Sequence, residues 1–508
     1  MAAVTQTRRT PRWDAQDIRR TLVPQILAVS LVVAYFVVMF VYVWYRHERF
    51  GTFDYDLGMY DQGIWNLSRG AGFMTLRGMH VFGHHANLGY LLMVPFYWVG
   101  LGGPHFLNFI NTLSVVACTV PLYAMARKGL RSDWAGLGVT FAFLFHYVPQ
   151  WMIHETFHPE NLAAPFIIGA LWYATEQRWR AYWICIGLAM IWKEDVALVV
   201  MMLGIVVGFV GHSAKRGLLT SVVGAVWFVF CIKVFIPFFA PDGAVFDGLF
   251  GELGKSASEV VGNAVSDPAR ARDILSEHGA DQGAIDMMAP FGFAALGSPH
   301  LLSLGLPQHI VNYLSVQNFT WSTEAHYAMF PFVAVALASV RTAITRSRRW
   351  LGMLIVLMMM AGVLLGINRG IGPWSERASQ GYWPGESPIR EANLRAALDV
   401  VPPDASVSAP YFLTPHLSHR PEIYTFPNPW RLQNWTPRDI AVQGPAPPET
   451  ARIAGVQYLI NEPTALDGAD AALYASIANS GEFEVVAQFG TVVVLHRIKP
   501  PSGTAVQQ

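Results

Sequence analysis

The stretch VPQILAVSLVVAYFVVMFVYVW, residues 23–44, decides the fold class of this chain. It contains no charged residue, and about 20 predominantly apolar residues are enough for a helix to cross a bilayer. A basic tract before it predicts a cytoplasmic N-terminus by the positive-inside rule, through Arg8, Arg9, Arg12, Arg19 and Arg20. A cleaved signal would have a shorter apolar core and a small-x-small exit, whereas this run leaves through YRHERF. We therefore expect an uncleaved spanning helix.

The composition of the whole chain agrees with a membrane protein. Of its 508 residues, 53% are hydrophobic and 14% are charged, whereas soluble domains carry about 25% charged residues. The formal net charge is zero, which gives no support for a nucleic-acid partner. Cys118, Cys185 and Cys231 lie in apolar runs without metal-binding spacing, so we expect buried thiols. A soluble globular protein is excluded.

Further apolar segments follow the first one along the chain, at 106–126, 133–153, 161–175, 181–192, 196–211, 217–239, 284–297, 301–316, 326–340 and 350–367. Together they predict an all-α polytopic transmembrane helical bundle of about eleven spans. Basic residues gather in alternate loops, as the positive-inside rule requires, at Arg127, Lys128, Arg131, Arg178, Arg180, Lys215, Arg216, Arg341, Arg346, Arg348 and Arg349.

This span count divides the chain into a cytoplasmic tail, 1–21, a transmembrane domain, 22–369, and an extracytoplasmic domain, 370–508. Two outer loops are large, 46–105 and 240–283. Within the first, segment 88–102 is short and interrupted by Pro and Gly, so we expect it to lie in the outer membrane interface.

The composition changes after about Gly370, where a Pro-rich entry is followed by β-rich runs. These runs are 405–409, 422–426, 456–460, 483–488 and 491–498. Helical stretches are expected from Ser387-Pro388 and over 466–479. The region therefore reads as a small α/β domain in the outer aqueous space.

Ionisable residues gather in the outer loops. The first loop holds Asp54, Asp56, Asp61, His80, His84 and His85; the second holds His154, Glu155, His158 and Glu160; later ones hold Lys193-Glu194-Asp195 and Glu324, His326 and Tyr327. Each cluster alone has an ordinary explanation, such as a polar loop or a self-neutralising turn. A zinc-protease helix is disfavoured because Pro159 directly follows His158. All clusters fall on one membrane face, where ionisable groups are costly, which favours a shared site.

Several of these motifs resemble a bacterial membrane-protein family known only as a domain of unknown function, DUF2079. They include Phe53-Asp54-Tyr55-Asp56-Leu57-Gly58, Asp61-Gln62-Gly63-Ile64-Trp65-Asn66, His84-His85-Ala86-Asn87, Phe157-His158-Pro159-Glu160, Lys193-Glu194-Asp195, His326-Tyr327 and His416-Leu417-Ser418-His419-Arg420. The family pattern reads Phe-Asp-Leu-Gly, so the extra Tyr55-Asp56 step leaves two aspartates as candidates for one acid. The spacing of Asp56-Leu57-Gly58 fits better.

The family in turn is similar to the GT-C superfamily of glycosyltransferases, which use polyprenyl-phosphate-linked sugars. The resemblance implies transfer of a sugar from such a donor to an extracytoplasmic hydroxyl on a glycan, lipid or protein acceptor, by direct displacement. Asp56 is then the expected catalytic base, with Asp54 second. Arg49, Lys193, Glu194, Asp195, His326 and Tyr327 are the expected substrate-binding residues.

A divalent metal ion is a candidate cofactor, held by His84, His85, His158 and Glu160. No nucleotide cofactor is expected, because the chain has neither a Walker motif nor a dinucleotide-binding glycine fingerprint. The resemblance also implies a bacterial plasma membrane. Two other classes stay open: a transporter of an envelope or lipid precursor, and a non-catalytic envelope assembly protein.

Overall fold

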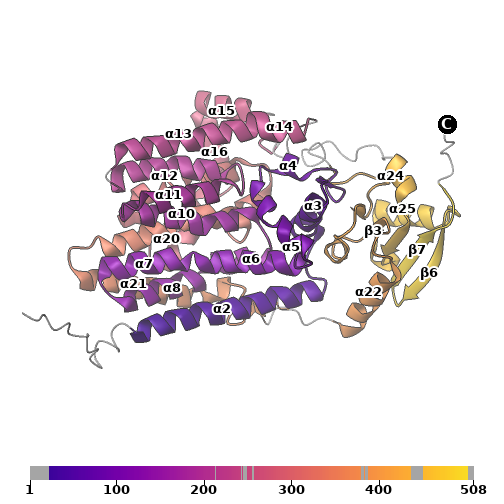
Figure 1. Ribbon diagram of the computed structural model, residues 1–508, viewed down its shortest axis with the longest axis horizontal. Coiled ribbons are helices and arrows are strands. Elements are labelled where there is room, and N and C mark those ends of the chain that lie inside the picture. Colours follow the sequence, from indigo (N-terminus) through magenta and orange to yellow (C-terminus); the bar gives the residue numbers. More distant parts are fainter. Residues whose placement is uncertain are drawn as a thin grey trace, which may run out of the picture.

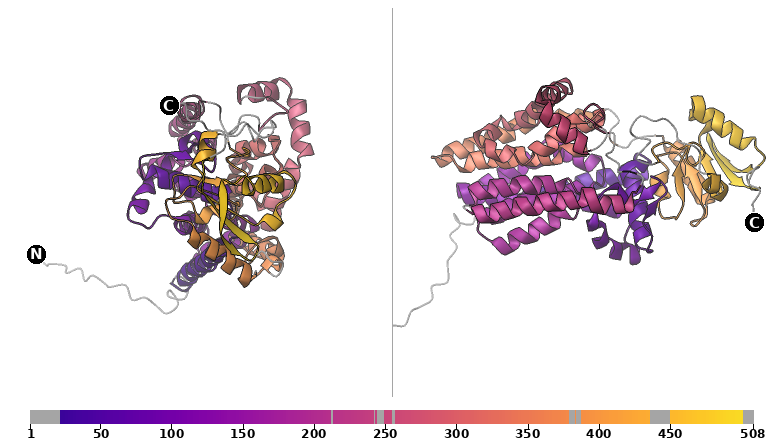
Figure 2. Two further views of the ribbon diagram at one scale, coloured as in Figure 1. Left: turned by 90° about the vertical axis from the view of Figure 1, so that its right-hand side faces the viewer. Right: turned by 90° about the horizontal axis from the view of Figure 1, so that it is seen from above.

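A long helical bundle carries a small mixed sheet at one end (Figure 1). The computed structural model describes residues 22–211, 213–241, 243, 249–254, 257–378, 383, 387–435 and 450–500. The predicted cytoplasmic tail, 1–21, lies outside the described residues. Seen from above, the sheet lies beyond one end of the bundle rather than along its side (Figure 2).

The bundle consists of helices that lie side by side (Figure 1). They are α2 (Val23–Glu48), α6 (Pro104–Ala117), α7 (Thr119–Leu130), α8 (Asp133–Phe145), α9 (Tyr147–His154), α10 (Pro159–Thr175), α11 (Trp179–Met190), α12 (Val196–Val210), α13 (Ala214–Phe230), α14 (Ile236–Phe239), α20 (Met329–Ile344) and α21 (Arg349–Leu365). Consecutive pairs pack against each other, α7 on α8, α10 on α11 and α12 on α13, as short loops between antiparallel helices require.

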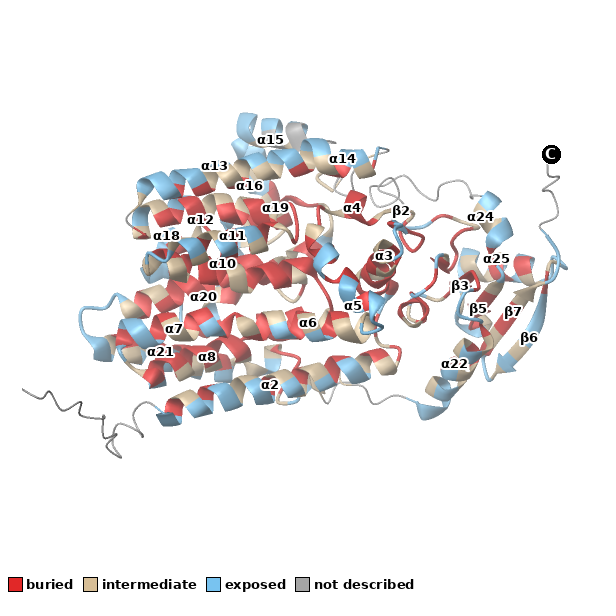
Figure 3. Cartoon of the chain, viewed as in Figure 1, coloured by how far each residue is buried: buried red, intermediate tan, exposed pale blue. Residues whose placement is uncertain are grey.

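Four helical stretches are long and apolar enough to cross a membrane: Val23–Glu48, Pro104–Leu130, Ala214–Phe239 and His326–Ile344. The outer surfaces of α2 and α13 are largely exposed (Figure 3), and they present apolar side chains such as Val29 and Val226. In water such surfaces would be unfavourable, whereas acyl chains match them. The helical membrane architecture is therefore confirmed, and the total of about eleven spans stays a prediction.

The predicted apolar segments 284–297 and 301–316 are broken into short pieces. These are α17 (Ala280–Met288), η5 (Ala289–Phe291), η6 (Ala294–Gly297), α18 (Pro299–Leu302) and α19 (Leu306–Leu314). Left-handed backbone at Gly292 and Phe293, with φ of 57° and 56°, interrupts the helical path. Pro299 is the first residue of α18 and Pro307 the second residue of α19, where a missing N–H costs nothing. Apolarity alone did not reveal these breaks.

The large outer loops fold into short elements. The first loop forms η2 (Asp54–Gly58), α3 (Met59–Leu67), a hairpin of β1 (Phe73–Met74) and β2 (Met79–His80), α4 (Val81–His84), η3 (Leu88–Leu92) and α5 (Val94–Trp98). The second contains α15 (Ala257–Ser266) and α16 (Pro268–Glu277). In segment 88–102, Leu91, Phe96, Trp98 and Val99 are exposed, as an interfacial segment requires.

The C-terminal unit, meaning described residues 387–435 and 450–500, has a five-stranded sheet of order β4-β3-β5-β7-β6. Its elements are α22 (Pro388–Val400), β3 (Val407–Ala409), β4 (Ile423–Thr425), α24 (Thr450–Gly455), β5 (Tyr458–Asn461), α25 (Gly468–Ala478), β6 (Phe483–Phe489) and β7 (Val492–Arg497). Strands β3, β4 and β5 are parallel, and β7 is antiparallel to β5 and β6. The predicted mixed α/β composition is confirmed.

Alternate residues of this sheet face different helices, as the two-residue period of a strand requires. Leu459 and Leu495 pack with Tyr474 and Ile477 of α25. On the other face, α22 packs against β6 and β7. The first outer loop, through α3, α4 and α5, lies between the bundle and this unit (Figure 1). Its side chains can therefore contact both.

Candidate functional site

Asp56 has an unusual backbone conformation. Its φ of 65° and ψ of −76° interrupt the helical turn of η2, and they lie near the positive-φ γ-turn, which is rare and strained. Such strain costs about 1–3 kcal/mol and persists only where the surroundings enforce it. The turn aims the carboxylate at His158, with 3.1 Å between Asp56 Oδ2 and His158 Nε2. The His158 side chain is 2% exposed and that of Asp56 is 31% exposed, so the carboxylate keeps an open side.

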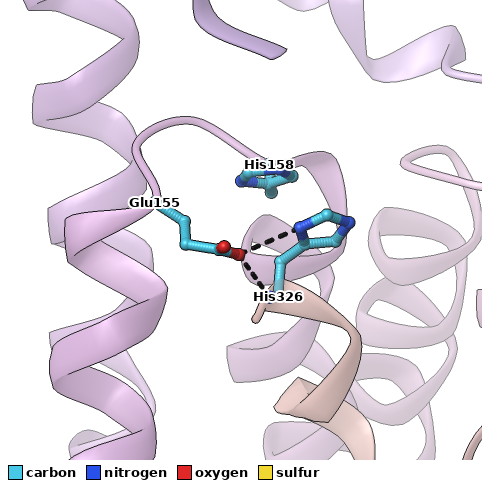
Figure 4. A group of neighbouring side chains, drawn as sticks. All are labelled: Glu155, His158 and His326. Atoms are coloured by element: carbon cyan, nitrogen blue, oxygen red, sulfur yellow. Dashed lines mark hydrogen bonds and ion pairs between the residues drawn. The ribbon is translucent and has the colours of Figure 1, made fainter. Parts of the chain in front are cut away.

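His158 and His326 come from different parts of the chain and stack, with 3.7 Å between ring centroids. His158 precedes the first residue of α10, and His326 begins η8 (His326–Ala328), directly before α20. Glu155 holds His326 in place: its Oε2 lies 3.1 Å from His326 Nδ1 and also accepts from the His326 backbone N–H (Figure 4). Helix starts therefore fix both imidazoles.

A buried lysine completes the group. Lys193 Nζ lies 2.8 Å from Glu160 Oε1 and 3.4 Å from Asp195 Oδ2. His326 Nε2 lies 3.7 Å from the same Glu160 oxygen, which connects the lysine to the stacked histidines. We call Asp56, Glu155, His158, Glu160, Lys193, Asp195 and His326 the acid–histidine cluster. It lies where α10, α12 and α20 begin, so three bundle helices present it at one end.

Burial and charge act against each other on the cluster residues. Burial favours the neutral form of His158, but the neighbouring carboxylate of Asp56 outweighs it and raises the pKa of His158 to about 9. Burial would likewise raise the pKa of Asp56, and His158 overcomes it, so that pKa is lowered. At neutral pH the pair is thus imidazolium and carboxylate. Burial raises the pKa of Asp195 to about 6.

A divalent metal ion fits this cluster. One ligand atom each from Glu155, His158 and His326 lies within 4.8 Å of the others. Within the described residues, His158 Nδ1, Glu160 Oε2 and Asp195 Oδ1 are buried and lack a hydrogen-bond partner. Two imidazoles and one carboxylate suit zinc, manganese or iron better than magnesium or calcium. Of the predicted metal set, His158 lies here with Glu155 and His326, and Glu160 lies beside them.

The other predicted metal ligands have separate partners. His85 Nδ1 lies 2.6 Å from Glu194 Oε1, and Glu194 Oε2 also accepts from the backbone N–H of Ala86 at 3.0 Å. His84 contacts the rings of Tyr60 and His85. Glu194, predicted to bind substrate, is therefore engaged in fixing the first outer loop to the turn before α12.

Two predicted substrate-binding residues have different placements. Tyr327 lies beside the cluster: its ring contacts that of His326, and Lys193 Nζ is 5.8 Å from its centroid. Arg49 is turned toward the C-terminal unit, with 3.6 Å between its Nε and Glu391 Oε1 on α22. The structure thus brings Tyr327, and not Arg49, to the cluster.

A second acidic group joins the first outer loop to the C-terminal unit. Thr425 Oγ1 donates to Asp54 Oδ2 at 2.7 Å, and Asp54 is 8% exposed. Asp61 is fully buried; it accepts from Tyr97 at 2.6 Å and from Ser418, and His419 Nε2 lies 3.0 Å from it. We call Asp54, Asp61, Ser418, His419 and Thr425 the seam cluster. Burial raises the pKa of Asp54 to about 6.

Sequence comparison gives one family. The family described as "Predicted membrane protein (DUF2079)" matches residues 46–447. No curated protein matches the chain.

Solved structures supply the fold comparison. ArnT from Cupriavidus metallidurans bound to undecaprenyl phosphate matches with a TM-score of 0.52 and 13% identity, over 92% of this chain and 98% of that one. An oligosaccharyltransferase from Archaeoglobus fulgidus in the apo form has a TM-score of 0.43 and 11% identity, over 86% and 69% of the two chains. At this identity the likeness to ArnT shows a shared overall fold, which agrees with the expected fold class.

Proposed function

The chain belongs to the DUF2079 family of predicted membrane proteins, and on that premise we propose that it is a membrane glycosyltransferase. The proposed reaction moves a sugar from a polyprenyl-phosphate-linked donor to a hydroxyl of an extracytoplasmic acceptor. The observation that carries the proposal is Asp56, an ionised and partly open carboxylate held in a strained turn against a buried imidazolium. Strain of this kind concentrates at sites of function.

Asp56 accepts the proton of the acceptor hydroxyl. As that oxygen forms its bond to the anomeric carbon, the bond from the anomeric carbon to the phosphate oxygen breaks and its electron pair leaves with the phosphate. His158 keeps Asp56 ionised and oriented, because its Nε2 contacts Asp56 Oδ2 and leaves the other carboxylate oxygen open. A positioned base of this kind contributes about 10²–10⁴-fold to rate.

The leaving phosphate gathers negative charge, which the cluster is equipped to balance. Lys193 keeps its proton: burial would lower its pKa, but Asp195 and Glu160 outweigh burial and raise that pKa well above its usual value. Lys193 and the imidazolium of His158 are the cations in reach. Metal ligands must be deprotonated, so a metal ion held by Glu155, His158 and His326 would replace the imidazolium proton of His158 and supply Lewis-acid stabilisation of the same phosphate in its place.

The position of the cluster favours this reaction over transport. His158, Glu160, Lys193, Asp195 and His326 lie at or just before the starts of α10, α12 and α20, whereas transporter sites lie near the bilayer midplane on broken helices. We place this end outside, at the outer face of a bacterial plasma membrane, with the N-terminus cytoplasmic. The exposed apolar residues of segment 88–102 would then meet the outer leaflet, where a prenyl chain can reach the cluster.

The test uses the full chain in liposomes with a panel of labelled polyprenyl-phosphate sugars and acceptor glycans or lipids extracted from the envelope. We expect acceptor-dependent release of polyprenyl phosphate by the wild-type protein and its loss in Asp56→Asn. Asp54→Asn is the matched control, because only Tyr55 separates Asp54 from Asp56, while Asp54 contacts the C-terminal unit and not His158.

Three outcomes would contradict the proposal. Equal release by wild type and Asp56→Asn, with both proteins folded, would remove Asp56 from the chemistry, and no release by either protein would favour an assembly role. Movement of a labelled precursor across the liposome membrane without any transfer product would favour a transporter.

A further inference from the structure

A cavity of about 270 Å³ lies within the bundle, away from the acid–histidine cluster. Its walls come from the ends of several helices and are lined by Met125, Lys128, Gly129, Leu171, Trp172, Thr175, Glu176, Val210, Leu301, Arg341 and Ile344. The volume falls just below the roughly 300 Å³ at which small-molecule sites begin. It therefore has room for a headgroup rather than for a whole lipid.

The cavity lies at the opposite ends of the helices that carry the cluster. Helices α10, α12 and α20 begin at the cluster and end at the cavity, through Thr175, Val210 and Ile344. Helix α10 has 17 residues, which at 1.5 Å per residue gives about 25 Å. That length approaches the roughly 30 Å of a hydrocarbon core. The cavity thus opens at the membrane face opposite the cluster.

The cavity wall combines apolar surface with an available cation. Leu171 and Leu301 are each 1% exposed. Arg341, half-buried at the wall, has no hydrogen-bond or ion-pair partner for its guanidinium within the described part of the chain. Lys128 is paired with Glu176. The lining therefore carries one net positive charge, and a buried indole N–H of Trp172 without a described partner adds a donor.

We propose that this cavity binds the phosphate-bearing headgroup of an anionic phospholipid from the leaflet opposite the acid–histidine cluster. The guanidinium of Arg341 pairs with the phosphodiester, while the acyl chains stay in the bilayer beside the apolar wall. A guanidinium matches phosphate oxygens in geometry and in charge. Basic pockets between spanning helices at the cytoplasmic side recognise anionic headgroups in this way.

The test is native mass spectrometry of the full chain in detergent, titrated with phosphatidylglycerol, with phosphatidylcholine as the neutral comparison. We expect wild type to bind phosphatidylglycerol in preference, and Arg341→Gln to weaken this binding roughly tenfold. The matched control is Arg346→Gln, which removes the same charge from an exposed residue just beyond the end of α20 and outside the cavity lining. Its affinity should match that of wild type.

A second variant keeps the test decisive if Arg341→Gln does not fold. Glu176→Gln removes the negative charge of the lining and should tighten phosphatidylglycerol binding. The proposal is overturned by equal loss in the Arg341 and Arg346 variants, by equal binding of phosphatidylcholine, or by unchanged affinity in Glu176→Gln. Undecaprenyl phosphate or inorganic phosphate displacing phosphatidylglycerol at equal concentration would also overturn it, because the site would then serve a prenyl phosphate or a free anion.

Discussion

Asp54 and Asp56 are separated by one residue and have opposite environments. Asp54 is enclosed by the C-terminal unit, accepts from Thr425, and burial raises its pKa to about 6. Asp56 faces the bundle, contacts an imidazolium and keeps an open side, and its pKa is lowered. The strained backbone of Asp56 turns the two carboxylates in different directions. An acid's neighbours, and not its place in a motif, therefore decide its use.

The same contrast extends to the two clusters. In the seam cluster, the Asp61 carboxylate accepts hydrogen bonds from a tyrosine and a serine and contacts a histidine, so both of its oxygens have partners. In the acid–histidine cluster, Glu160 and Asp195 each retain a buried oxygen that no described group satisfies. Unsatisfied buried polar atoms are costly and call for an explanation, such as a ligand. The seam cluster thus joins the first outer loop to the C-terminal unit, whereas the acid–histidine cluster keeps polar atoms that a ligand would satisfy.

The largest expected effect separates the two aspartates directly. Asp56→Asn should lower sugar transfer by about 10²–10⁴-fold, because the proton acceptor is lost. Asp54→Asn should keep most of the turnover, since an amide oxygen still accepts from Thr425. Initial rates in liposomes measure both. Equal losses in the two variants would erase the distinction between the clusters.

Lys193→Ala should destabilise the bundle end by about 3–5 kcal/mol, because Glu160 and Asp195 are then buried without their cation. Lys128→Ala is the matched control: its ion pair with Glu176 is exposed on the lysine side and should contribute less than about 1 kcal/mol. Chemical unfolding in detergent compares the two. Similar decreases in the free energy of unfolding would show that burial does not make the Lys193 ion pairs stronger than the exposed pair of Lys128.

The pH dependence of stability should have opposite signs at the two aspartates. The pKa of Asp54 is raised from 3.8 to about 6, so its contribution is full below pH 3.8 and is lost as pH rises through 6. The contribution of Asp56 is present above 3.8 and is lost as pH falls through its lowered pKa. In the wild-type protein the ionisation of Asp54 should lower the free energy of unfolding by up to about 3 kcal/mol between pH 4 and 7. Asp54→Asn should remove this decrease. Unfolding midpoints measured across this range test it.

Metal binding should be confined to the acid–histidine cluster. Glu155→Gln should weaken zinc or manganese binding at least about tenfold, since a negatively charged ligand is lost. Ser418→Ala, in the seam cluster, should leave it unchanged. Elemental analysis after equilibrium dialysis measures the ion content of each protein, and binding unaffected by Glu155→Gln would remove that residue from the ligand set.

The smallest effect is expected at the seam. Ser418→Ala should cost about 1–2 kcal/mol, because Asp61 loses one hydrogen bond but keeps Tyr97 and His419. Hydrogen exchange of the C-terminal unit should rise while that of α10 does not. Faster exchange throughout the bundle would mean that the two regions unfold as one.

The sequence predicted the membrane bundle and the five strands, because continuous apolar runs and β-rich runs are local signals. It also predicted that His158, Lys193, Glu160 and His326 would share one end of the bundle, since the span count placed their loops on one face. It did not separate Asp54 from Asp56, because the turn at Asp56 depends on tertiary contacts. It did not predict the ion pair of Arg49, because Glu391 lies more than 300 residues away.

His419 and Ser418 were visible only as a motif, with no sign that they complete the setting of Asp61. Such pairings join segments over 350 positions apart, and neither periodicity nor spacing encodes them. The sequence gives Glu155 no role, because its partner His326 lies 171 positions further on.

The hydrogen bond from Thr425 to Asp54 connects the C-terminal unit to the loop that carries Asp56. Because only Tyr55 separates Asp54 from Asp56, pulling the sheet away from the bundle would draw the proposed base off His158 by way of the backbone. An acceptor that moved the C-terminal unit on docking would thereby shift the carboxylate of Asp56 without contacting it. A protein cleaved between the bundle and the C-terminal unit would lose this connection to Asp56 once the unit dissociated.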